Sequence, residues 1–416
     1  MHETNIAVAK LNARLVTVSS FFSELTFILP VWLLYSLDIL HFKPTLAVAI
    51  FMSIWVVSAL LEVPTGALAD RFGRRKIFIV GQLLFSLYPL AYAFKLPVGL
   101  LVFVCFISAV GSSMRSGALL PIVHSIYKQA GLGDKAYNLF LSNNQMAMFI
   151  ARALTGVTGA WLYTLNPTWP FYAMFGATIL NFGLGFFIKD TPVPKEKTSN
   201  YRHIKQTFAL VRKSNVVVGI LVAYATFNMT AETIWTGYQV FFQDDGRSTF
   251  VIGVLFSAAA IFSTLGAYLI RYGSARFHPL KLMELFGLGV LGTAILLTQP
   301  NHLLRLAAII PVGLGFGTTS VILNSTIQKH IINRYQATAL SMVNFLQYGV
   351  YAIGSLAFGV LLQTFGAVNT RTVLFSTSLA ASVGVMIYGL THKPILHDSV
   401  AVSSKEYQTK TEAIVE

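Results

Sequence analysis

Charge and cysteine are both scarce in this chain of 416 residues. Charged residues make up 11% of it, against about 25% in ordinary soluble domains, while hydrophobic residues make up 55%. The one cysteine, Cys105, lies inside an apolar run, so no disulfide can form within the chain. Together these features exclude a soluble enzyme, a disordered chain and a secreted disulfide scaffold.

Motifs for nucleotide or metal chemistry are also missing. There is no G-x-x-x-x-G-K-[ST] phosphate loop, which disfavours transport driven by ATP on this chain. There is no H-E-x-x-H and no cluster of cysteine and histidine, so we predict neither a metal site nor a cofactor. No nucleophile stands with a base in adjacent apolar segments, and we therefore predict that the protein is not an enzyme.

Long apolar runs recur from one end of the chain to the other. A run of about twenty apolar residues crosses roughly 30 Å of hydrocarbon as a helix. These runs are too long and too little alternating to be strands of a membrane barrel. The sequence predicts an all-α integral membrane protein with twelve transmembrane helices. We expect them at residues 15–37, 46–69, 77–96, 98–126, 138–164, 170–188, 215–242, 250–270, 282–299, 303–327, 338–364 and 372–391.

The basic residues predict the orientation of these helices. The net charge of +14 does not indicate nucleic acid, because Lys and Arg gather in the cytoplasmic loops of membrane proteins. With both termini cytoplasmic, 23 of the 30 basic residues lie in inner segments and 5 in outer loops, while Arg115 and Arg152 lie within spans. We expect a multi-pass protein of the inner cell membrane, with the lipid bilayer as its surroundings and a monomer as its state.

The order of spans and polar segments indicates two halves. The polar segment between them places Ile204, Phe208 and Val211 on one face of a basic helix, as expected for a helix on the membrane surface. A solvated linker fits the same residues. The predicted parts are an N-terminal six-helix half (1–188), a cytoplasmic linker with an amphipathic helix (189–214), a C-terminal six-helix half (215–391) and a cytoplasmic tail (392–416).

Residues 200 positions apart suggest that the two halves arose by duplication. The segment GALADRFGRRK, which begins at Gly66, lies opposite GAYLIRYGSAR, which begins at Gly266. The same offset pairs Gly117 with Gly317 and Asn144 with Asn344, among others. Parallel repeats are a transporter architecture, in which the substrate site lies between the halves near the middle of the membrane.

The first of these segments carries a resemblance to a known family. The loop between helices 2 and 3 of the major facilitator superfamily reads G-x-L-a-D-r-x-G-r-K-x, and EVPTG and RSGALLPIVHS are similar to stretches in its bacterial drug/proton antiporters. The sequence therefore resembles that superfamily over its whole length. The resemblance implies a cytoplasmic gate motif in this chain, formed by Glu62, Gly66, Asp70, Arg71, Gly73, Arg74 and Arg75.

The physics of this loop fits a gate. Gly66 and Gly73 allow close backbone approach and a tight turn. Asp70 can face the positive N-terminus of a helix, which the resemblance implies to be helix 11 of the other half. Ile270 replaces the aspartate in the second copy, so one latch is expected. An ordinary basic cytoplasmic loop is the alternative reading.

Ionisable residues inside spans are the candidates for coupling. A charge at the centre of a membrane helix costs at least about 2.5–3.5 kcal/mol, so each such residue is expected to face a cavity or a partner. Glu24 and Arg152 lie deep in helices 1 and 5, which suggests one pair, and Glu62 with Arg115 a second, although other pairings fit equally. Glu24 and Glu232 are our candidates for proton coupling, while Glu62 and Arg115 also fit a structural bridge.

A substrate cavity is expected among polar and aromatic residues within the spans. Trp235 and Tyr238 follow Glu232 at helical spacing, as do Phe241 and Phe242, for which a membrane-interface belt is the alternative. Asn144 belongs to a polar patch in helix 5 that more often serves hydrogen bonds between helices than ligands. The cavity candidates are Glu24, Arg115, Arg152, Asn144, Trp235 and Tyr238.

These features predict a secondary transporter that moves a small molecule by alternating access with protons, or another ion, as coupling partner. Efflux of lipophilic or cationic compounds is the first hypothesis, and it depends on the family resemblance together with Glu24 and Glu232. A proton-coupled importer or a uniporter of a sugar or organic anion is the alternative, because Arg115 and Arg152 suit a carboxylate. A membrane sensor or lipid-handling protein without transport is the alternative from another class.

Overall fold

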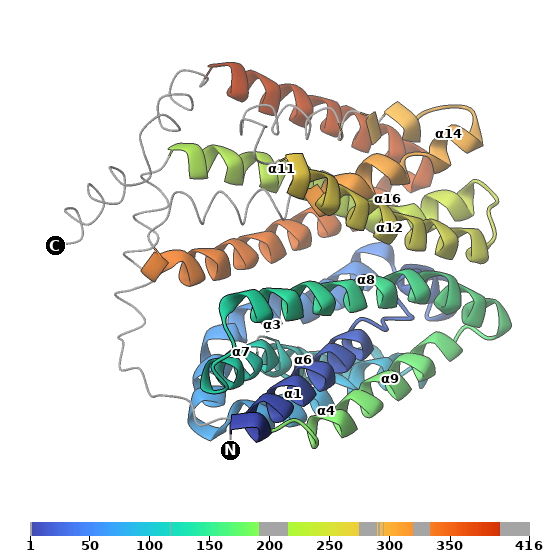
Figure 1. Ribbon diagram of the computed structural model, residues 1–416. Coiled ribbons are helices and arrows are strands. Elements are labelled where there is room, and N and C mark those ends of the chain that lie inside the picture. The colour runs from blue at the N-terminus through green and yellow to red at the C-terminus, as the bar shows by residue number, and fades with distance from the viewer. Residues whose placement is uncertain are drawn as a thin grey trace. The chain divides into compact units, whose positions relative to one another are not determined.

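The computed structural model of the protein describes residues 2–116, 118–190, 215–273, 289, 292–293, 295–318 and 333–391. The regular structure of these residues is helical, which confirms the predicted all-α class (Figure 1). The elements are α1 (His2–Ser23), α2 (Trp32–Leu34), the π-helix η1 (Tyr35–Ile39), α3 (Pro44–Phe72), α4 (Arg74–Phe85), α5 (Leu87–Ala93), α6 (Val98–Arg115), α7 (Leu119–Gln129), α8 (Asp134–Leu165), α9 (Trp169–Gly185), α11 (Asn215–Asp244), α12 (Thr249–Gly273), α14 (His302–Leu306) and α16 (Asn333–Thr391).

Five segments among the described residues are long and apolar enough to cross a membrane. They are Pro44–Glu62, Arg74–Ala93, Val98–Gln129, Thr249–Leu269 and Phe345–Leu374. The first four fall on predicted spans, so these apolar runs do form helices of spanning length. Phe345–Leu374 runs from the eleventh predicted span, across the expected loop, into the twelfth. The total of twelve stays a prediction, because α9 has only 17 residues and several predicted spans run into segments beyond the described ranges.

Some predicted elements lie outside the described residues. The amphipathic helix of the linker falls on residues 191–214, and the cytoplasmic tail falls on residues 392–416. Most of the ninth predicted span, 282–299, also lies outside them.

The chain divides into two compact units. The N-terminal unit comprises residues 1–195 and 246–257, and the C-terminal unit comprises residues 196–245 and 258–416. The beginning of α12 thus packs with the N-terminal unit: the Ser257 hydroxyl donates to the Ala153 carbonyl in α8 and accepts from the Val157 N–H at 3.0 Å. The predicted halves and their internal repeat remain predictions.

In the N-terminal unit, α1 packs against α7, α8 and α9 (Figure 1). Ala9, Ala13 and Val16 on α1 are buried in a core with residues of α4, α7 and α8. Polar contacts fix α1 on α9: the Ser19 hydroxyl donates to Asn181 Oδ1 at 2.6 Å, and Asn181 Nδ2 donates to Ser23 Oγ at 2.8 Å. The end of α1 is therefore held in place at the residue before Glu24.

In the C-terminal unit, α11 packs along α16. Phe241 and Phe358 meet edge to face with their ring centroids 5.8 Å apart. The element α16 covers both the eleventh and twelfth predicted spans, and the backbone leaves the helical conformation between them at Gly366, where φ is 72°.

Candidate functional site

Helix 1 is broken at Glu24. The α-helix ends at Ser23, residues 24–31 form turns and irregular structure, and α2 begins at Trp32. The prediction of one continuous helix over 15–37 is therefore wrong. Pro30 lies inside this irregular segment and opposes a helix there, because it has no N–H to donate and disfavours the helical conformation of the residue before it. Turn hydrogen bonds replace the helical ones, among them the Thr26 N–H to the Glu24 carbonyl at 2.8 Å.

Glu24 pairs with Arg152 of α8. Arg152 Nε donates to Glu24 Oε2 at 2.7 Å, which confirms the first suggested pair. The Glu24 side chain is 18% exposed and the Arg152 side chain 45%. Charge-assisted hydrogen bonds of this length are the stronger kind. The pair therefore joins the break in helix 1 to α8, and both side chains keep some exposed surface.

Gly159, two turns further along α8, packs against the irregular segment of helix 1. A Cβ at Gly159 would lie 2.1 Å from the carbonyl oxygen of Phe27, so a larger residue cannot fit without a shift. Arg152 and Gly159 are seven residues apart and thus share one face of α8. This face holds the irregular segment by an ion pair at one point and by close backbone contact at the other.

Asn144 lies on α8 two turns before Arg152. Its side chain is buried, and Nδ2 lies 3.6 Å from the sulfur of Met148 in the same helix. Its Oδ1 is buried without a hydrogen-bond partner among the described residues. The expected hydrogen bond between helices is therefore absent from this part of the chain.

The loop between α3 and α4 turns at Gly73. Gly73 has φ 98°, a backbone conformation that side chains disfavour, which confirms the tight turn predicted there. The Asp190 carboxylate accepts a hydrogen bond from the Arg75 N–H at 3.1 Å, next to the N-terminus of α4. The Arg75 side chain donates to the carbonyls of Gly185 and Phe186 at the end of α9. Anion and cation each lie at the helix end that favours them.

Other residues of the gate motif contribute less to these contacts. No described atom lies within 4 Å of a Cβ placed on Gly66, so the expected close approach is absent there. Arg71 lies 5.2 Å from the centroid of the Phe72 ring. The side chains of Asp70, Ile270 and Arg271 lie outside the described part, and the predicted latch stays a prediction.

The second suggested ion pair, Glu62 with Arg115, stays a prediction. The Arg115 guanidinium lies over the ring of Phe85, 3.8 Å from its centroid. Such a cation–π contact is worth about 0.5–2 kcal/mol. The sequence analysis named no aromatic partner for Arg115, because this contact depends on the packing of α6 against α4.

A hydrogen-bonded network lies beside Glu232 in the C-terminal unit. Tyr224 donates to Gln347 Oε1 at 2.6 Å, Gln347 donates to the Tyr351 hydroxyl, and Tyr351 donates to Asn228 Oδ1 at 3.0 Å. Asn228 is one turn before Glu232 on α11, and Glu232 is partly buried. No pattern in the sequence indicates this network, because α11 and α16 supply its members from 123 positions apart.

The aromatic residues after Glu232 are inside the C-terminal unit. Tyr238 is 1% exposed and packs on Trp235 with centroids 5.4 Å apart, while Trp235 also meets Phe316. Phe241 and Phe242 are buried, so the belt alternative is wrong for both. The role of Trp235 and Tyr238 in a substrate cavity stays a prediction.

Three charged residues of the C-terminal unit form a buried cluster. Asp245 Oδ1 pairs with Arg371 Nη1 at 3.1 Å and also with Arg305. Arg371 Nη2 further donates to the Phe241 carbonyl at 2.8 Å. All three side chains are at most 13% exposed. Arg305 and Arg371, which are two of the five basic residues expected in outer loops, join α11, α14 and α16 through these contacts.

No group of three or more His, Cys, Asp or Glu side chains that could hold a metal ion occurs among the described residues. The Cys105 side chain is buried.

The chain is similar to known membrane transporters in both sequence and fold. The family model described as Major Facilitator Superfamily matches residues 15–355. The multidrug resistance protein MdtL of Shewanella sp. (strain ANA-3) is 28% identical over 273 residues, which are 61% of this chain and 65% of the relative. The chain thus matches about two thirds of that relative's length.

Solved structures share the fold at low identity. The nucleoside transporter NupG has a TM-score of 0.74 at 13% identity and covers 91% of this chain and 98% of its own. The D-xylose-proton symporter has a TM-score of 0.69 at 14% identity and covers 92% of this chain and 97% of its own. A peptide transporter crystallised with sulfate has a TM-score of 0.72 at 16% identity and covers 92% and 94%. Because the family model spans most of the sequence and these folds agree with it, the chain belongs to the Major Facilitator Superfamily of multi-pass secondary transporters.

Proposed function

We propose that the protein is a proton-coupled exporter of lipophilic or cationic small molecules that works by alternating access. The ion pair between Glu24 and Arg152 at the break in helix 1 is the observation that carries this proposal. The relative from Shewanella is a multidrug resistance protein, which agrees with export. Glu24 is the proposed proton carrier, and Glu232 is the second candidate.

The surroundings of the pair suit an exchange of partners. A charged pair within a span is expensive and is retained where it has a use. Both side chains are accessible to solvent, so a proton or a small molecule can reach the carboxylate. Irregular backbone within a broken membrane helix commonly lines a transport cavity. Residues 24–31 supply such backbone beside Glu24.

The proposed coupling follows from competition for one carboxylate. A proton that binds Glu24 Oε2 makes the side chain neutral and releases the Arg152 guanidinium. When that proton leaves to water, the carboxylate can pair again with Arg152 or with a cationic substrate. Since the proton and the cation cannot be held together, the inward movement of one drives the outward movement of the other.

The proposed residues of the substrate cavity are Glu24, Arg115, Arg152, Asn144, Trp235 and Tyr238. Flat aromatic rings bind apolar molecules and attract cations, which supports the proposed substrate class. We further propose that Glu62, Gly66 and the loop through Arg75 form a cytoplasmic gate, in a monomer with cytoplasmic termini in the inner membrane.

Uptake of an organic anion is the second candidate. Arg152 is 45% exposed beside its carboxylate partner, and a guanidinium is suited to bind an organic anion. Uptake and export differ in the direction in which a proton gradient moves the substrate. A sensor or lipid-handling protein would move none at all.

Proteoliposomes that contain only this protein test the proposal. With an imposed pH gradient, we expect tetraphenylphosphonium to accumulate on the acidic side against its own gradient. Glu24→Gln should abolish this accumulation and retain exchange of tetraphenylphosphonium at equal concentrations. Asp244→Asn, which neutralises an exposed carboxylate outside the candidate residues, is the control and should retain accumulation.

The other outcomes contradict the proposal in different ways. If Glu24→Gln still accumulates the probe, the proton site lies elsewhere, and Glu232→Gln is the next variant to measure. If wild type accumulates lactate rather than tetraphenylphosphonium, uptake of an organic anion replaces export. If tetraphenylphosphonium, lactate and D-xylose all fail to cross the membrane, the protein transports neither lipophilic cations, organic anions nor sugars of these kinds.

A further inference from the structure

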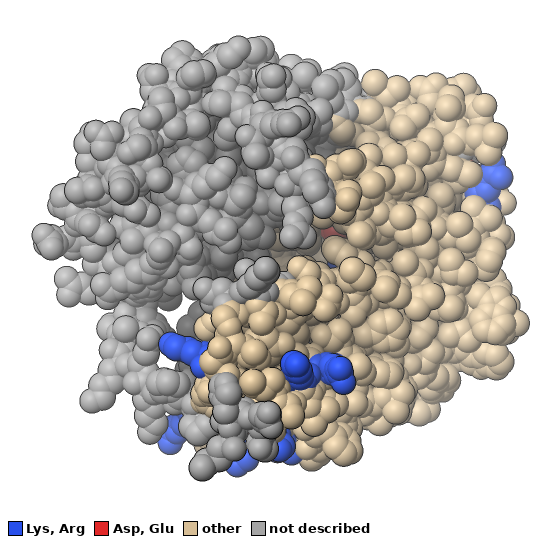
Figure 2. Space-filling model, in the orientation of Figure 1, with Lys and Arg blue, Asp and Glu red and all other residues tan. Residues whose placement is uncertain are grey.

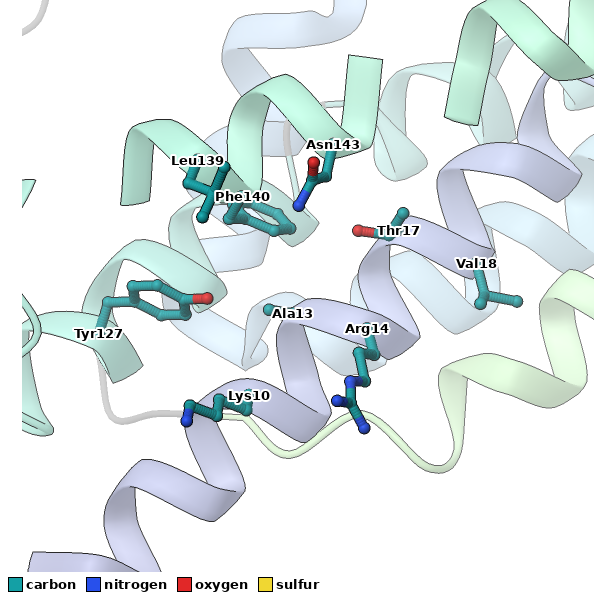
Figure 3. Close-up of a pocket in the computed structure, with 9 residues that line it drawn as sticks. All are labelled: Lys10, Ala13, Arg14, Thr17, Val18, Tyr127, Leu139, Phe140 and Asn143. Atoms are coloured by element: carbon teal, nitrogen blue, oxygen red, sulfur yellow. The ribbon is translucent and has the colours of Figure 1, made fainter. Parts of the chain in front are cut away.

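A pocket of about 460 Å³ opens in the N-terminal unit, away from the Glu24–Arg152 pair. Its nine lining residues come from α1, α7 and α8 (Figure 3). Lys10, Arg14 and Thr17 lie on one face of α1, since they are spaced by four and three residues. Leu139, Phe140 and Asn143 face them from α8, and Tyr127 faces them from α7. Pockets of about 300–1,000 Å³ accommodate small ligands.

Five side chains of this pocket are polar, those of Lys10, Arg14, Thr17, Tyr127 and Asn143. Figure 3 shows the Thr17 hydroxyl, the Asn143 amide and the Tyr127 hydroxyl turned toward the space between the three helices, with Lys10 and Arg14 on α1 at its edge. Neither Lys10 nor Arg14 forms an ion pair with a described residue. None of the nine lining residues is acidic. The pocket therefore offers two positive charges to a ligand.

The apolar side of the pocket is exposed as well. Val18 is 42% exposed and Leu139 is 64% exposed, while Phe140 is buried in the core beneath. Along α1 the lining changes from basic at Lys10 and Arg14, through the hydroxyl of Thr17, to apolar at Val18. In the view of Figure 2, Lys and Arg side chains gather over the N-terminal unit, in the lower part of the picture.

We infer that this pocket binds the head group of an anionic phospholipid, with the phosphate at Lys10 and Arg14 and the start of an acyl chain along Val18 and Leu139. Basic pockets between membrane helices bind such head groups, because they attract the phosphate while the neighbouring apolar surface stays in contact with lipid. A free phosphate would use the charges and leave the exposed apolar side chains in water. The order of side chains along α1 therefore favours the lipid.

Lipid binding to the purified full-length protein in detergent tests the inference. Native mass spectrometry and the thermal unfolding midpoint are measured with phosphatidylglycerol, phosphatidylcholine and glycerol 3-phosphate. We expect phosphatidylglycerol to bind at least tenfold more tightly than phosphatidylcholine and to raise the midpoint by several degrees. Each basic residue near an anionic lipid contributes about fivefold in affinity, so Lys10→Gln with Arg14→Gln should weaken binding about 25-fold.

A second pair of substitutions tests whether lipid binding depends on the pocket or on the net charge of the protein. Lys43 and Lys95 are exposed basic residues outside the pocket, and Lys43→Gln with Lys95→Gln removes the same charge. This control should bind phosphatidylglycerol as wild type does. If the basic double variant does not fold, Asn143→Leu with Thr17→Val keeps the charges and should weaken binding three- to tenfold.

Three results would overturn the inference. Equal affinity for phosphatidylglycerol and phosphatidylcholine would remove the role of the charge. Equal stabilisation by glycerol 3-phosphate would make the ligand a free anion rather than a lipid. An equal loss of binding in the Lys43 and Lys95 control would assign the effect to net charge and not to the pocket.

Discussion

Gly159 of α8 lies against the carbonyl of Phe27 so closely that a Cβ on Gly159 would stand 2.1 Å from the oxygen. The contact is possible because helix 1 is irregular at Phe27 and α8 has no side chain at Gly159. The same face of α8 holds Glu24 through Arg152. The conformation of the break and the position of the charged pair therefore depend on one packing contact.

Gly159→Ala should displace the break and weaken both folding and transport. Forcing a methyl group into a closely packed site costs about 1–3 kcal/mol. We expect the thermal midpoint of the purified protein to fall by several degrees and proton-driven transport to fall at least fivefold. Gly176→Ala on α9 is the control, since no described atom lies within 4 Å of a Cβ there. Wild-type stability of Gly159→Ala would mean that Phe27 moves freely.

A double-mutant cycle on Glu24 and Arg152 should separate stability from coupling. Arg152→Gln alone leaves a carboxylate without its cation in a span, and we expect a loss of stability and at least tenfold slower transport. Glu24→Gln with Arg152→Gln removes both charges and should recover most of the stability but none of the proton-driven accumulation. Unfolding midpoints and flux on the four proteins give the interaction energy. Additive losses would show that the pair is not coupled.

Asp245→Asn should destabilise the C-terminal unit. Two buried arginines would then face a neutral amide, and breaking a buried ion pair from one side costs about 3–5 kcal/mol. Thermal or denaturant unfolding of the purified protein measures this loss. Asp244→Asn is the control, because it removes the same charge at the neighbouring exposed position. Equal midpoints for the two variants would contradict the structural role of the cluster.

Asp70→Asn should reduce transport at least tenfold and leave membrane insertion intact. The reason is the motif: the proposed latch needs the charge at a helix N-terminus, while the substitution makes no span more polar. Arg271→Ala should do less damage than Arg71→Ala, because the second copy of the loop has Ile270 in place of the aspartate. Flux by correctly inserted variants measures both effects. Normal flux through Asp70→Asn would remove the gate assignment.

Hydropathy and spacing were enough to predict most of the local structure. Apolar runs of spanning length dictate membrane helices, because a backbone in lipid must satisfy its own hydrogen bonds. Gly73 could be assigned to a tight turn from the sequence because glycine adopts backbone conformations that other residues disfavour. The suggestion that Glu24 pairs with Arg152 came from the cost of isolated charge in a span, although spacing allowed other pairings.

The break in helix 1 was not predicted from the same information. Pro30 was visible in the sequence, but proline is tolerated in many membrane helices when neighbours satisfy the freed groups. Whether the helix bends or opens depends on what lies beside it, which here is Gly159 on another helix. Asp190 was missed for a related reason, since its helix-capping role depends on the close approach of α4 and α9.

The sequence by itself thus determined the class of the protein, its apolar helices and the loop motif, because these follow from composition and from spacing along one segment. Only the tertiary structure decided which charges meet. Arg152 reached Glu24, Arg115 turned to Phe85, and Asp245 gathered two arginines from outer segments. Such choices depend on packing between helices far apart in the chain, where a difference of a few ångströms selects one partner over another.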